Sequence, residues 1–587
     1  MATASKPRRR TVPAPASAGA SGRRPLPWPV STAGAVLLIG LLTRPMLVSH
    51  ADTGQSWYVH LWYLAHQAGS IRDNGVPSLF VHDGPAVFNP HYAFYGGSLY
   101  AAAGALALAI GSVKAAYVIS WVLGFAAAYG GWLWLGRSAG VRGWWAHIPG
   151  ALFITSPYYL ALPYSEGDWP EFMAVSTIPL LMASILDVLV AERLRPLPAL
   201  ALAAGTVLFF GSHNITMLWG TTVLAIAATA VALAVPRARR RVTRRGVLRL
   251  AAVMAPAVCV DAWFLAPDLA YHAHTLIAGD SAAWRFLLTW SAPFVAPRHL
   301  LSLDRSTVEP TILHFSLQLP VPGLAWIVAG LAVLRPGRRS PWLRANIVLL
   351  VLIAALVVLM TNVGMLLALP GPYGLLQFGY RLESYILLAV SGAVLGVLVL
   401  AAAAGPRRAR WSWLVVPILA VSVIQAAAQV DVHRPHVSDP MAFKDVAARY
   451  HTPQVAPGIT DFVSRDLPPI ERIQGLRHVR FAASAQDGDR AAITVDARPG
   501  QRFITNAMTM PELVDLGGAR FAGRSNGYAV VEVPPGATPG AARITLRAAR
   551  PLPVAIGQAL SLFGVAALAA HGVAMSLGWR RRRRTAD

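Results

Sequence analysis

The run VSTAGAVLLIGLLTRPMLV (30–48) and the segment SHADTGQSWYVH (49–60) directly after it decide how the chain is read. A helix of about 20 apolar residues crosses the hydrocarbon core of a bilayer. The first run therefore predicts a membrane-spanning helix. Asp52 follows at the point where that helix should leave the membrane, so its carboxylate is either a solvated loop group or part of a functional site.

The rest of the chain repeats this pattern. Of its 587 residues, 55% are hydrophobic, and the recurring apolar runs of about 20 residues exceed what a soluble core can bury. The composition predicts a polytopic membrane protein. The formal net charge of +24 lies in short clusters between apolar runs, which favours cytoplasmic loops over nucleic-acid binding. The single cysteine, Cys259, excludes a disulfide framework and a cysteine metal site.

Both ends of the chain are basic. Residues 1–28 are rich in Pro, Ala, Ser and Arg and predict a disordered cytoplasmic tail, and residues 578–587 predict a second, short cytoplasmic tail. Ser49-His50-Ala51 resembles a signal-peptidase site, but the apolar run before it is long for a signal peptide. We therefore expect an uncleaved first helix.

The basic loops fix the expected topology. One apolar run, 97–112, would place the later basic loops opposite the basic N-terminus if it crossed the membrane, so we expect a juxtamembrane or re-entrant helix there. The resulting fold class is mainly α, a polytopic membrane protein of about 12 transmembrane helices with both termini cytoplasmic. The expected spans lie near 30–48, 115–135, 144–160, 173–190, 198–211, 217–235, 248–265, 321–334, 346–368, 385–403, 411–427 and 553–577.

The domain organisation follows from a change in composition. Residues 29–428 form the expected transmembrane domain, with outer loops 49–114 and 266–320. From 429 to 552 apolar runs give way to alternating segments, which predict an extracytoplasmic β-sandwich before the last helix, 553–577. The expected strands are HVRFAASA, AAITVDA, RFITNAM, GYAVVEV and ARITLRA, separated by DGD, RPGQ, GGARFAGRSNG and PPGATPGA.

This topology brings polar groups to one face of the membrane. Ionisable groups near a bilayer are costly unless they are paired or used, so their concentration on the outer face predicts a site there. The segments concerned are Asp52, SEGDWPEF (165–172), SHN (212–214), the loop 267–320 and QFGYRLES (377–384).

Each group also has a structural explanation. The histidines of the first loop, including His60, fit no standard zinc spacing, and interfacial packing explains them. Asp168 followed by Glu171 resembles a helix cap. Arg381 could extend to the interface, pair with Glu383, or hold a lipid phosphate. A carboxylate partly out of water, such as Asp52, is suited to proton abstraction.

Together these features resemble the GT-C fold membrane glycosyltransferases, in particular a large bacterial group of integral membrane proteins. The matching elements are Asp52 with His60 eight residues on, the Pro90–Gly96 entry to a juxtamembrane helix that includes Tyr95, YSEGDWPEF (164–172), the Ser-His-Asn end of a span with His213 and Asn214, the Phe378–Arg381 segment, and the late β domain. The resemblance covers most of the chain, and each motif is short.

The resemblance implies a chemistry. In that family the first-loop Asp deprotonates the acceptor hydroxyl and the donor is a polyprenyl-phosphate sugar, which would make Asp52 the catalytic base here. Arg381 and His213 would hold the donor phosphate. His60, Tyr95, Glu166, Asp168, Glu171, Asn214 and Glu383 would contribute to donor or acceptor binding. The chain departs from the family pattern at Glu166, where an Arg is usual.

Two alternatives stay open. A transporter or flippase of lipid-linked intermediates would also line a path with polar groups, but here the ionisable groups lie mainly at one end of the spans. A catalytically inactive scaffold of the same fold is the other alternative, given Glu166. The expected partners are the lipid-linked donor, a glycan, glycolipid or protein acceptor of the cell envelope, and membrane lipid. The sequence requires no cofactor, although several carboxylates could hold Mg²⁺ or Mn²⁺.

Overall fold

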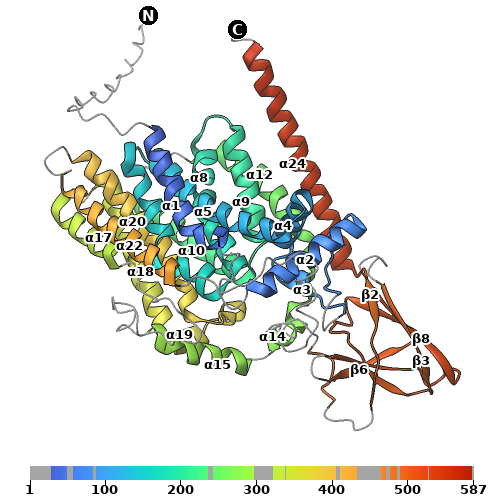
Figure 1. Cartoon of the computed structure of the whole chain (residues 1–587). Coiled ribbons are helices and arrows are strands. Elements are labelled where there is room, and N and C mark those ends of the chain that lie inside the picture. The colour runs from blue at the N-terminus through green and yellow to red at the C-terminus, as the bar shows by residue number, and fades with distance from the viewer. Residues whose placement is uncertain are drawn as a thin grey trace, which may run out of the picture.

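The structure is a computed structural model, and most of the chain it describes is helical (Figure 1). The described residues are 28–48, 57–82, 87–235, 242–279, 281–295, 321–337, 339–404, 410–432, 465–470, 476–484, 490–525 and 528–584. Asp52 and most of the loop 267–320 beyond Val295 therefore lie outside the described residues.

Fifteen described helices have ten residues or more. They are α1 (Trp28–Val48), α2 (Trp57–Asn74), α4 (Gly97–Ile110), α5 (Val113–Ser138), α8 (Trp169–Val190), α9 (Pro196–Phe210), α10 (Asn214–Ala234), α12 (Arg244–Val260), α13 (Ala262–Tyr271), α15 (Ser281–Ser291), α17 (Val321–Leu334), α18 (Pro341–Thr361), α20 (Glu383–Ala403), α22 (Val415–Val432) and α24 (Leu552–Arg584).

Short helices connect them. They are α3 (His91–Phe94), η1 (Gly143–His147), α6 (Ile148–Ile154), α7 (Pro157–Ala161), the π-helix η2 (Leu162–Glu166), η3 (His272–His274), α14 (Leu276–Gly279), η4 (Ala292–Val295), α19 (Val363–Leu367), η6 (Gly371–Leu375), η7 (Gly379–Leu382) and η8 (Arg410–Leu414).

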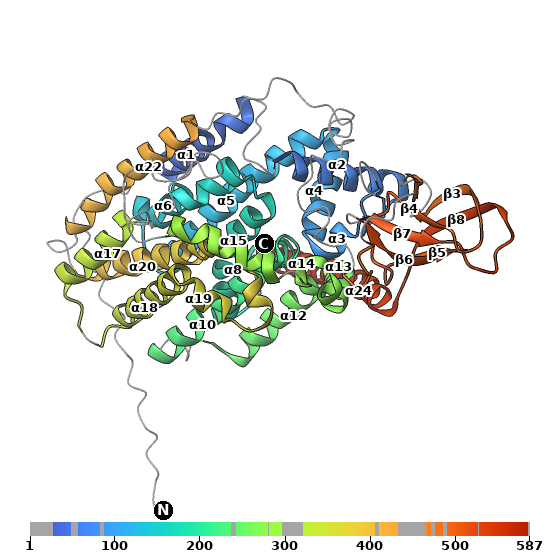
Figure 2. The same cartoon turned by 90° about the horizontal axis from the view of Figure 1, so that it is seen from below.

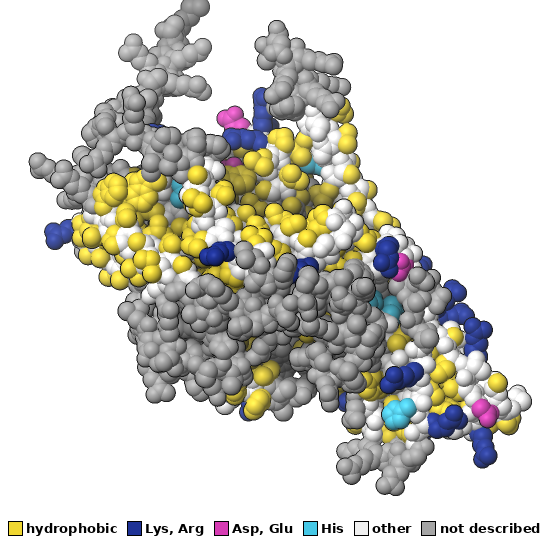
Figure 3. Space-filling model, viewed as in Figure 1, with side chains coloured by type: hydrophobic (Ala, Val, Ile, Leu, Met, Phe, Trp, Pro, Cys, Tyr) yellow, Lys and Arg dark blue, Asp and Glu magenta, His cyan; other side chains and the backbone are white. Residues whose placement is uncertain are grey.

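Six helices in the described part of the chain are long and apolar enough to cross a membrane, or seven if the bent pair α12 and α13 counts as one. Five shorter apolar helices accompany them, among them α4 over the run 97–112. The total of 12 spans and the sidedness of the termini stay predictions. On the face in Figure 3, hydrophobic side chains cover the described helical surface, and Lys and Arg gather on the β region.

Three expected spans are interrupted. The run 144–160 is divided among η1, α6 and α7, because prolines at 149 and 157 each begin a new helix and supply no backbone donor. The run 346–368 ends as α18 at Thr361, and Asn362 caps α19 by accepting from Met365 N at 3.0 Å. The run 248–265 bends by 71° between α12 and α13.

The last helix packs against this bend. Ser561 Oγ lies 3.1 Å and 2.9 Å from the carbonyl oxygens of Cys259 and Val260 and accepts from Trp263 N at 2.8 Å. At Gly564 a Cβ would come within 2.6 Å of Pro256 O, so only glycine allows α24 to approach this closely. The Ser561 hydroxyl of α24 thus satisfies backbone atoms that the break leaves without helical partners.

The strands form two four-stranded sheets at one end of the molecule, as Figures 1 and 2 both show. One has the order β1-β4-β7-β6 and the other β2-β3-β8-β5. The strands are β1 (Arg477–His478), β2 (Ala482–Ser484), β3 (Arg490–Ala497), β4 (Arg502–Ile504), β5 (Val514–Gly517), β6 (Arg520–Ser525), β7 (Tyr528–Glu532) and β8 (Gly540–Ala548).

One prediction for this region is wrong. The stretch GGARFAGRSNG, expected to be a connection, contains β6, which pairs with β7 through a bulge between Phe521 and Gly523. Its glycines suggested a loop, but Gly523 has a φ of +152° and lies against Pro468 O, where a side chain would clash.

The sheets share a core with the helical part. Phe80, Phe88 and Phe264 belong to the same buried cluster as Phe503 and Leu546 of the sheets. The backbone adds hydrogen bonds at residue 87, whose N–H donates to Asn506 O and whose carbonyl accepts from Met508 N. The segment around residue 87 is therefore bound to the β region, and α24 follows that region directly in the chain.

Candidate functional site

A buried arginine joins two carboxylates that lie far away in the sequence. Arg381 Nη2 is 3.0 Å from Asp168 Oδ2, and its Nε is 3.0 Å from Glu171 Oε2. The three residues are 8%, 7% and 1% exposed. Ions this deeply buried are stable only as a paired group, so the ion pairs fix η7 to the start of α8.

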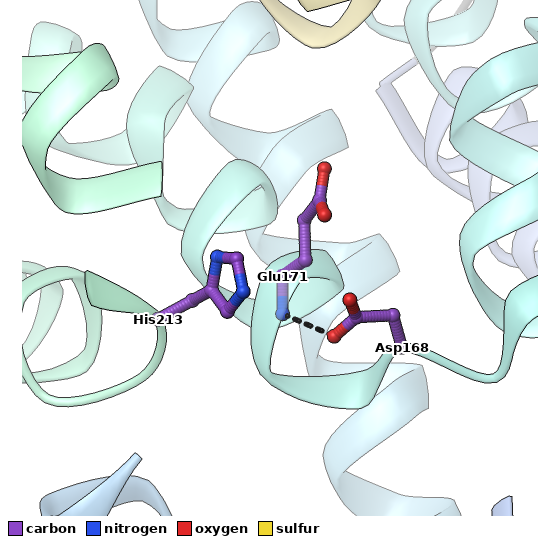
Figure 4. Close-up of side chains that lie close together, drawn as sticks. All are labelled: Asp168, Glu171 and His213. Atoms are coloured by element: carbon purple, nitrogen blue, oxygen red, sulfur yellow. Dashed lines mark hydrogen bonds between the residues drawn. The ribbon is translucent and has the colours of Figure 1, made fainter. Parts of the chain in front are cut away.

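The local sequence explains why the two carboxylates converge. Gly167, with a φ of +66°, ends η2, and Asp168 then caps α8 by accepting from Glu171 N at 3.1 Å (Figure 4). Glu171 lies in the first turn, where an anion is favoured by the helix dipole. The predicted helix cap is therefore present, and its two acids also bind Arg381.

Two tyrosines complete the bonding of these carboxylates. Tyr158 donates to Glu171 Oε1 at 3.0 Å, and Tyr95 donates to Asp168 Oδ1 over a longer 3.4 Å. Three of the four carboxylate oxygens thus accept a hydrogen bond within the protein, and the fourth, Glu171 Oε2, lies 3.0 Å from Arg381 Nε as an ion pair without a hydrogen bond. Burial raises the pKa of the Asp168 carboxyl, but neighbouring His213 and Arg381 more than offset this, and the pKa lies below its ordinary value.

His213 faces the same two acids (Figure 4). It caps α10 through Nδ1, which accepts from Thr216 N at 3.2 Å and lies 2.7 Å from Thr216 Oγ1. Burial lowers the pKa of its imidazole to about 3 against the opposing effect of Asp168, so the ring is neutral near pH 7. It can exchange a hydrogen bond with a ligand without bringing a charge.

Asp168, Glu171 and His213 are the residues of this site that could hold a metal. Each offers one ligand atom, and these atoms lie within 4.8 Å of one another. The donor types suit a divalent cation. However, both carboxylates are ion-paired with Arg381, whose guanidinium supplies the positive charge that a metal would bring. The arrangement fits an ion-paired cluster rather than a metal centre.

His60 lies beside this cluster. Its Nδ1 is 2.6 Å from Tyr100 OH, and its ring stacks at 6.4 Å from that of Tyr95. Burial lowers the pKa of His60 to about 4, with Asp168 opposing the shift. The imidazole is therefore a neutral group near pH 7, linked to Asp168 through Tyr95.

Glu166, the residue that departs from the family pattern, adds a third carboxylate. Burial, followed by repulsion from Glu171, raises its pKa well above the ordinary value, and a hydrogen bond with Tyr380 opposes this. Its Oε1 is buried and has no hydrogen-bond partner among the described residues. The cation that the family pattern places here is absent, and Arg381 pairs with Glu171 instead.

Two of the expected residues do not join the cluster. Asn214 donates through Nδ2 to Phe94 O and to Asp268 Oδ2, both at 2.7 Å, which ties α10 to α3 and α13. Glu383 is 1% exposed and makes none of the ion pairs found among the described residues. The suggested pairing of Arg381 with Glu383 is wrong, because the guanidinium lies against the first turn of α8.

The structure thus gathers seven of the expected residues and adds others. The seven are His60, Tyr95, Glu166, Asp168, Glu171, His213 and Arg381. Sequence reasoning missed Tyr100, Tyr158 and Tyr380, whose hydroxyls bind these residues. The aromatic residues beside each polar motif were the available signal, since a tyrosine can be buried when its hydroxyl finds a partner.

Comparisons with known proteins add little to this geometry. The sequence matches no protein-family model and no curated protein sequence. Among solved structures, the chain is similar to the apo form of the Archaeoglobus fulgidus oligosaccharyltransferase, with 12% sequence identity and a TM-score of 0.42. The match covers 77% of this chain and 62% of that chain.

Proposed function

We propose that this protein is a membrane glycosyltransferase that transfers a sugar from a polyprenyl-phosphate donor to an acceptor of the cell envelope. One observation carries the proposal: Arg381 is buried and held rigidly by Asp168 and Glu171. The two ion pairs involve Nε and Nη2 of Arg381, and Nη1 donates no hydrogen bond within the described part of the chain. One end of the guanidinium is therefore available for a ligand oxygen.

This geometry suits a departing phosphate. When the glycosidic bond of such a donor breaks, negative charge develops on the phosphate oxygen, and a donor fixed in advance stabilises it without reorganisation. Arg recognises phosphate well because its planar fork stays charged at all relevant pH values. Neutral His213 and His60 would orient hydroxyl groups of the donor or acceptor beside it. No step requires a metal at this cluster.

Asp52 is the proposed general base. It precedes the start of α2 at Trp57 by five positions, and α2 carries His60 in its first turn. A carboxylate in this loop would take the proton of the acceptor hydroxyl as that oxygen attacks the anomeric carbon and the carbon–phosphate oxygen bond breaks. The β region would hold the acceptor glycan, and the reaction would take place on the outer face of a bacterial plasma membrane.

The test is transfer in detergent. Purified protein would be incubated with radiolabelled undecaprenyl-phosphate hexoses and pentoses and an envelope glycan extract, and labelled product would be counted. We expect Asp52→Asn to lower turnover by about 10²–10⁴-fold, the usual contribution of a general base. Arg381→Lys should lower kcat more than it raises KM, because it loses the planar fork. The exposed Glu192→Gln serves as the control.

Full turnover by Asp52→Asn would remove that residue from the base role, and no product with any donor would overturn the proposal. The bent pair α12 and α13 favours the transporter alternative, since broken helices are common in transporters. The same assay separates the two, because transport yields no chemical product and requires a sealed compartment.

A further inference from the structure

A buried carboxylate lies at the bend between α12 and α13, apart from the candidate site. Asp261 ends α12 and directly precedes α13. It is 0% exposed, and it makes none of the ion pairs found in the described part of the chain. The Ser98 hydroxyl lies beside it, but neither carboxylate oxygen has a partner at hydrogen-bonding geometry among the described residues. This carboxylate is therefore shielded from solvent and lacks a positive partner within that part of the chain.

Two helix ends add negative charge around the carboxylate. Asp261 is the C-cap of α12, and α9 ends at Gly211. A Cβ at Gly211 would lie 2.9 Å from Asp261 Oδ1 and 2.6 Å from Val207 O, so the glycine lets the carboxylate approach the last turn of α9. The helix α13 begins at the next residue, but the Asp261 side chain does not cap it. Because the C-terminal end of a helix favours a cation, the fold places an anion where a cation is favoured.

A bound cation would compensate this charge. An ionised group inside a membrane protein is costly unless it is paired or used. We propose that Asp261, the Ser98 hydroxyl and the terminal carbonyl oxygens of α9 bind a monovalent cation, Na⁺, within the helical part. Carboxylate, hydroxyl and carbonyl oxygens are the ligands that a hard cation prefers. A single positive charge neutralises one carboxylate, whereas a divalent ion would leave an excess charge in apolar surroundings.

The segments that supply these oxygens are already fixed to one another. Leu99 N donates to Gly211 O at 3.0 Å, which joins α4 to the end of α9. Trp263 Nε1 donates to Ser98 Oγ at 3.2 Å, which joins α4 to the bend and leaves a second lone pair of this hydroxyl for an ion. The ligand oxygens therefore need little rearrangement, which lowers the entropy cost of binding. Broken helices in membrane transporters coordinate Na⁺ through the same kinds of group.

The ion would also support the candidate site. Ser98 follows Tyr95 by three positions, and Gly211 precedes His213 by two. An ion that joins α4 and α9 to the bend would therefore help to hold Tyr95 and His213 in place, a positioning role that includes no chemical step. The binding itself does not depend on the proposed transfer reaction.

The test measures ²²Na⁺ binding to the full-length protein in detergent at equilibrium, by scintillation proximity. We expect one ion per chain in the wild type, displaced by NaCl but not by equimolar KCl or choline chloride. Asp261→Asn keeps the shape of the side chain and should lower binding by roughly tenfold or more, because it removes the charged ligand. Asp187→Asn is the matched control, since the carboxylate of Asp187 accepts from Trp134 Nε1 at 3.1 Å, and it should retain the ion.

Thermal unfolding separates loss of the ion from loss of the fold. In choline chloride Asp261→Asn should melt at or above the temperature of the wild type, because a buried amide costs less than an unpaired carboxylate. Replacing choline with Na⁺ should raise the melting temperature of the wild type and leave that of Asp261→Asn unchanged. No bound ²²Na⁺ in the wild type, equal binding in Asp261→Asn, or equal displacement by KCl would overturn the proposal. None of these results depends on glycosyl transfer.

Discussion

Two clusters of histidine and carboxylate lie in the described part of the molecule, and the negative charge of their acids is compensated in different ways. Asp168 and Glu171 each form an ion pair of 3.0 Å with Arg381, which supplies a permanent positive charge. In the second cluster, formed by His274, Asp466 and Glu512, Asp466 Oδ2 lies 2.5 Å from His274 Nδ1, and these two side chains are 49% and 44% exposed. The first cluster lies inside the helical part and the second lies at its border with the β region.

The difference follows from the cost of burying charge. A carboxylate inside a protein stays ionised only with a counterion of its own, because water no longer compensates for its lost hydration. A carboxylate near solvent keeps much of its hydration and needs no internal counterion. Buried acids with a fixed arginine therefore indicate a site organised in advance, whereas half-exposed acids are compensated by water and by a neighbouring imidazole.

The largest effect should come from removing the internal counterion. Arg381→Met leaves Asp168 and Glu171 buried without a positive partner, which should cost about 3–5 kcal/mol of folding free energy. Thermal unfolding followed by tryptophan fluorescence would measure it. The triple variant Arg381→Met, Asp168→Asn, Glu171→Gln should recover most of the loss. A single variant as stable as the wild type would show that the ion pairs do not hold the site together.

Acid should destabilise the inner cluster next most strongly. The pKa of His60 falls from 6.5 to about 4 on folding, so between these pH values the imidazole is protonated in the unfolded chain and neutral in the folded chain. Stability from this group is complete above pH 6.5 and declines as pH falls towards 4, where about 3 kcal/mol is lost. His60→Gln should flatten the melting-temperature profile between pH 6.5 and 4. The exposed His478→Gln is the control, and identical slopes in all three proteins would refute the assignment.

Tyr158→Phe tests whether each oxygen of the inner cluster needs its donor. The hydroxyl donates to a buried carboxylate at 3.0 Å, and its loss should cost about 1.5–3 kcal/mol. Tyr95→Phe removes a longer bond of 3.4 Å and should cost less, which makes it the matched comparison. Chemical unfolding would rank the two. A reversed order would mean that Tyr95, rather than Tyr158, supports the cluster.

Glu166→Gln should have the smallest effect, in the stabilising direction. Because burial raises the folded-state pKa of this acid, the folded chain retains a proton that the unfolded chain releases, and stability falls as pH rises above 4.5. Glutamine removes that penalty, so the melting temperature at pH 7 should rise by about 2 °C, equivalent to roughly 1 kcal/mol. A fall at pH 7, relative to wild type, would show that the carboxylate is needed as an anion.

The sequence predicted the helix cap of this site but not the ion-pair partners of Arg381. Asp168 and Glu171 were recognisable as a helix cap, since capping depends on neighbours three positions apart. The partner of Arg381 was not, because Glu383 is near in sequence while Asp168 is 213 positions away. Choosing between them requires the packing of η7 against α8, which no local pattern encodes.

The apolar helices show the same difference between local features, which the sequence predicts, and long-range contacts, which it does not. Apolar runs predicted where helices lie, because hydrophobicity along a run is a local property. The 71° bend between α12 and α13 was missed, since nothing within residues 248–265 reveals that Ser561 will receive the exposed backbone groups. In the β region, alternation found β3, β7 and β8 but not β6, whose glycines serve a close contact with another segment.

The contact between Ser561 and the bend also constrains the order of biogenesis. The serine follows Trp263 by 298 positions, so at a ribosomal rate of roughly 5–20 residues per second the bend is inserted on the order of half a minute before its partner exists. The β region is synthesised in the meantime, because α24 comes after it in the chain. The bend between α12 and α13 therefore enters the membrane without its partner, and the hydrogen bonds from Ser561 form only late in assembly.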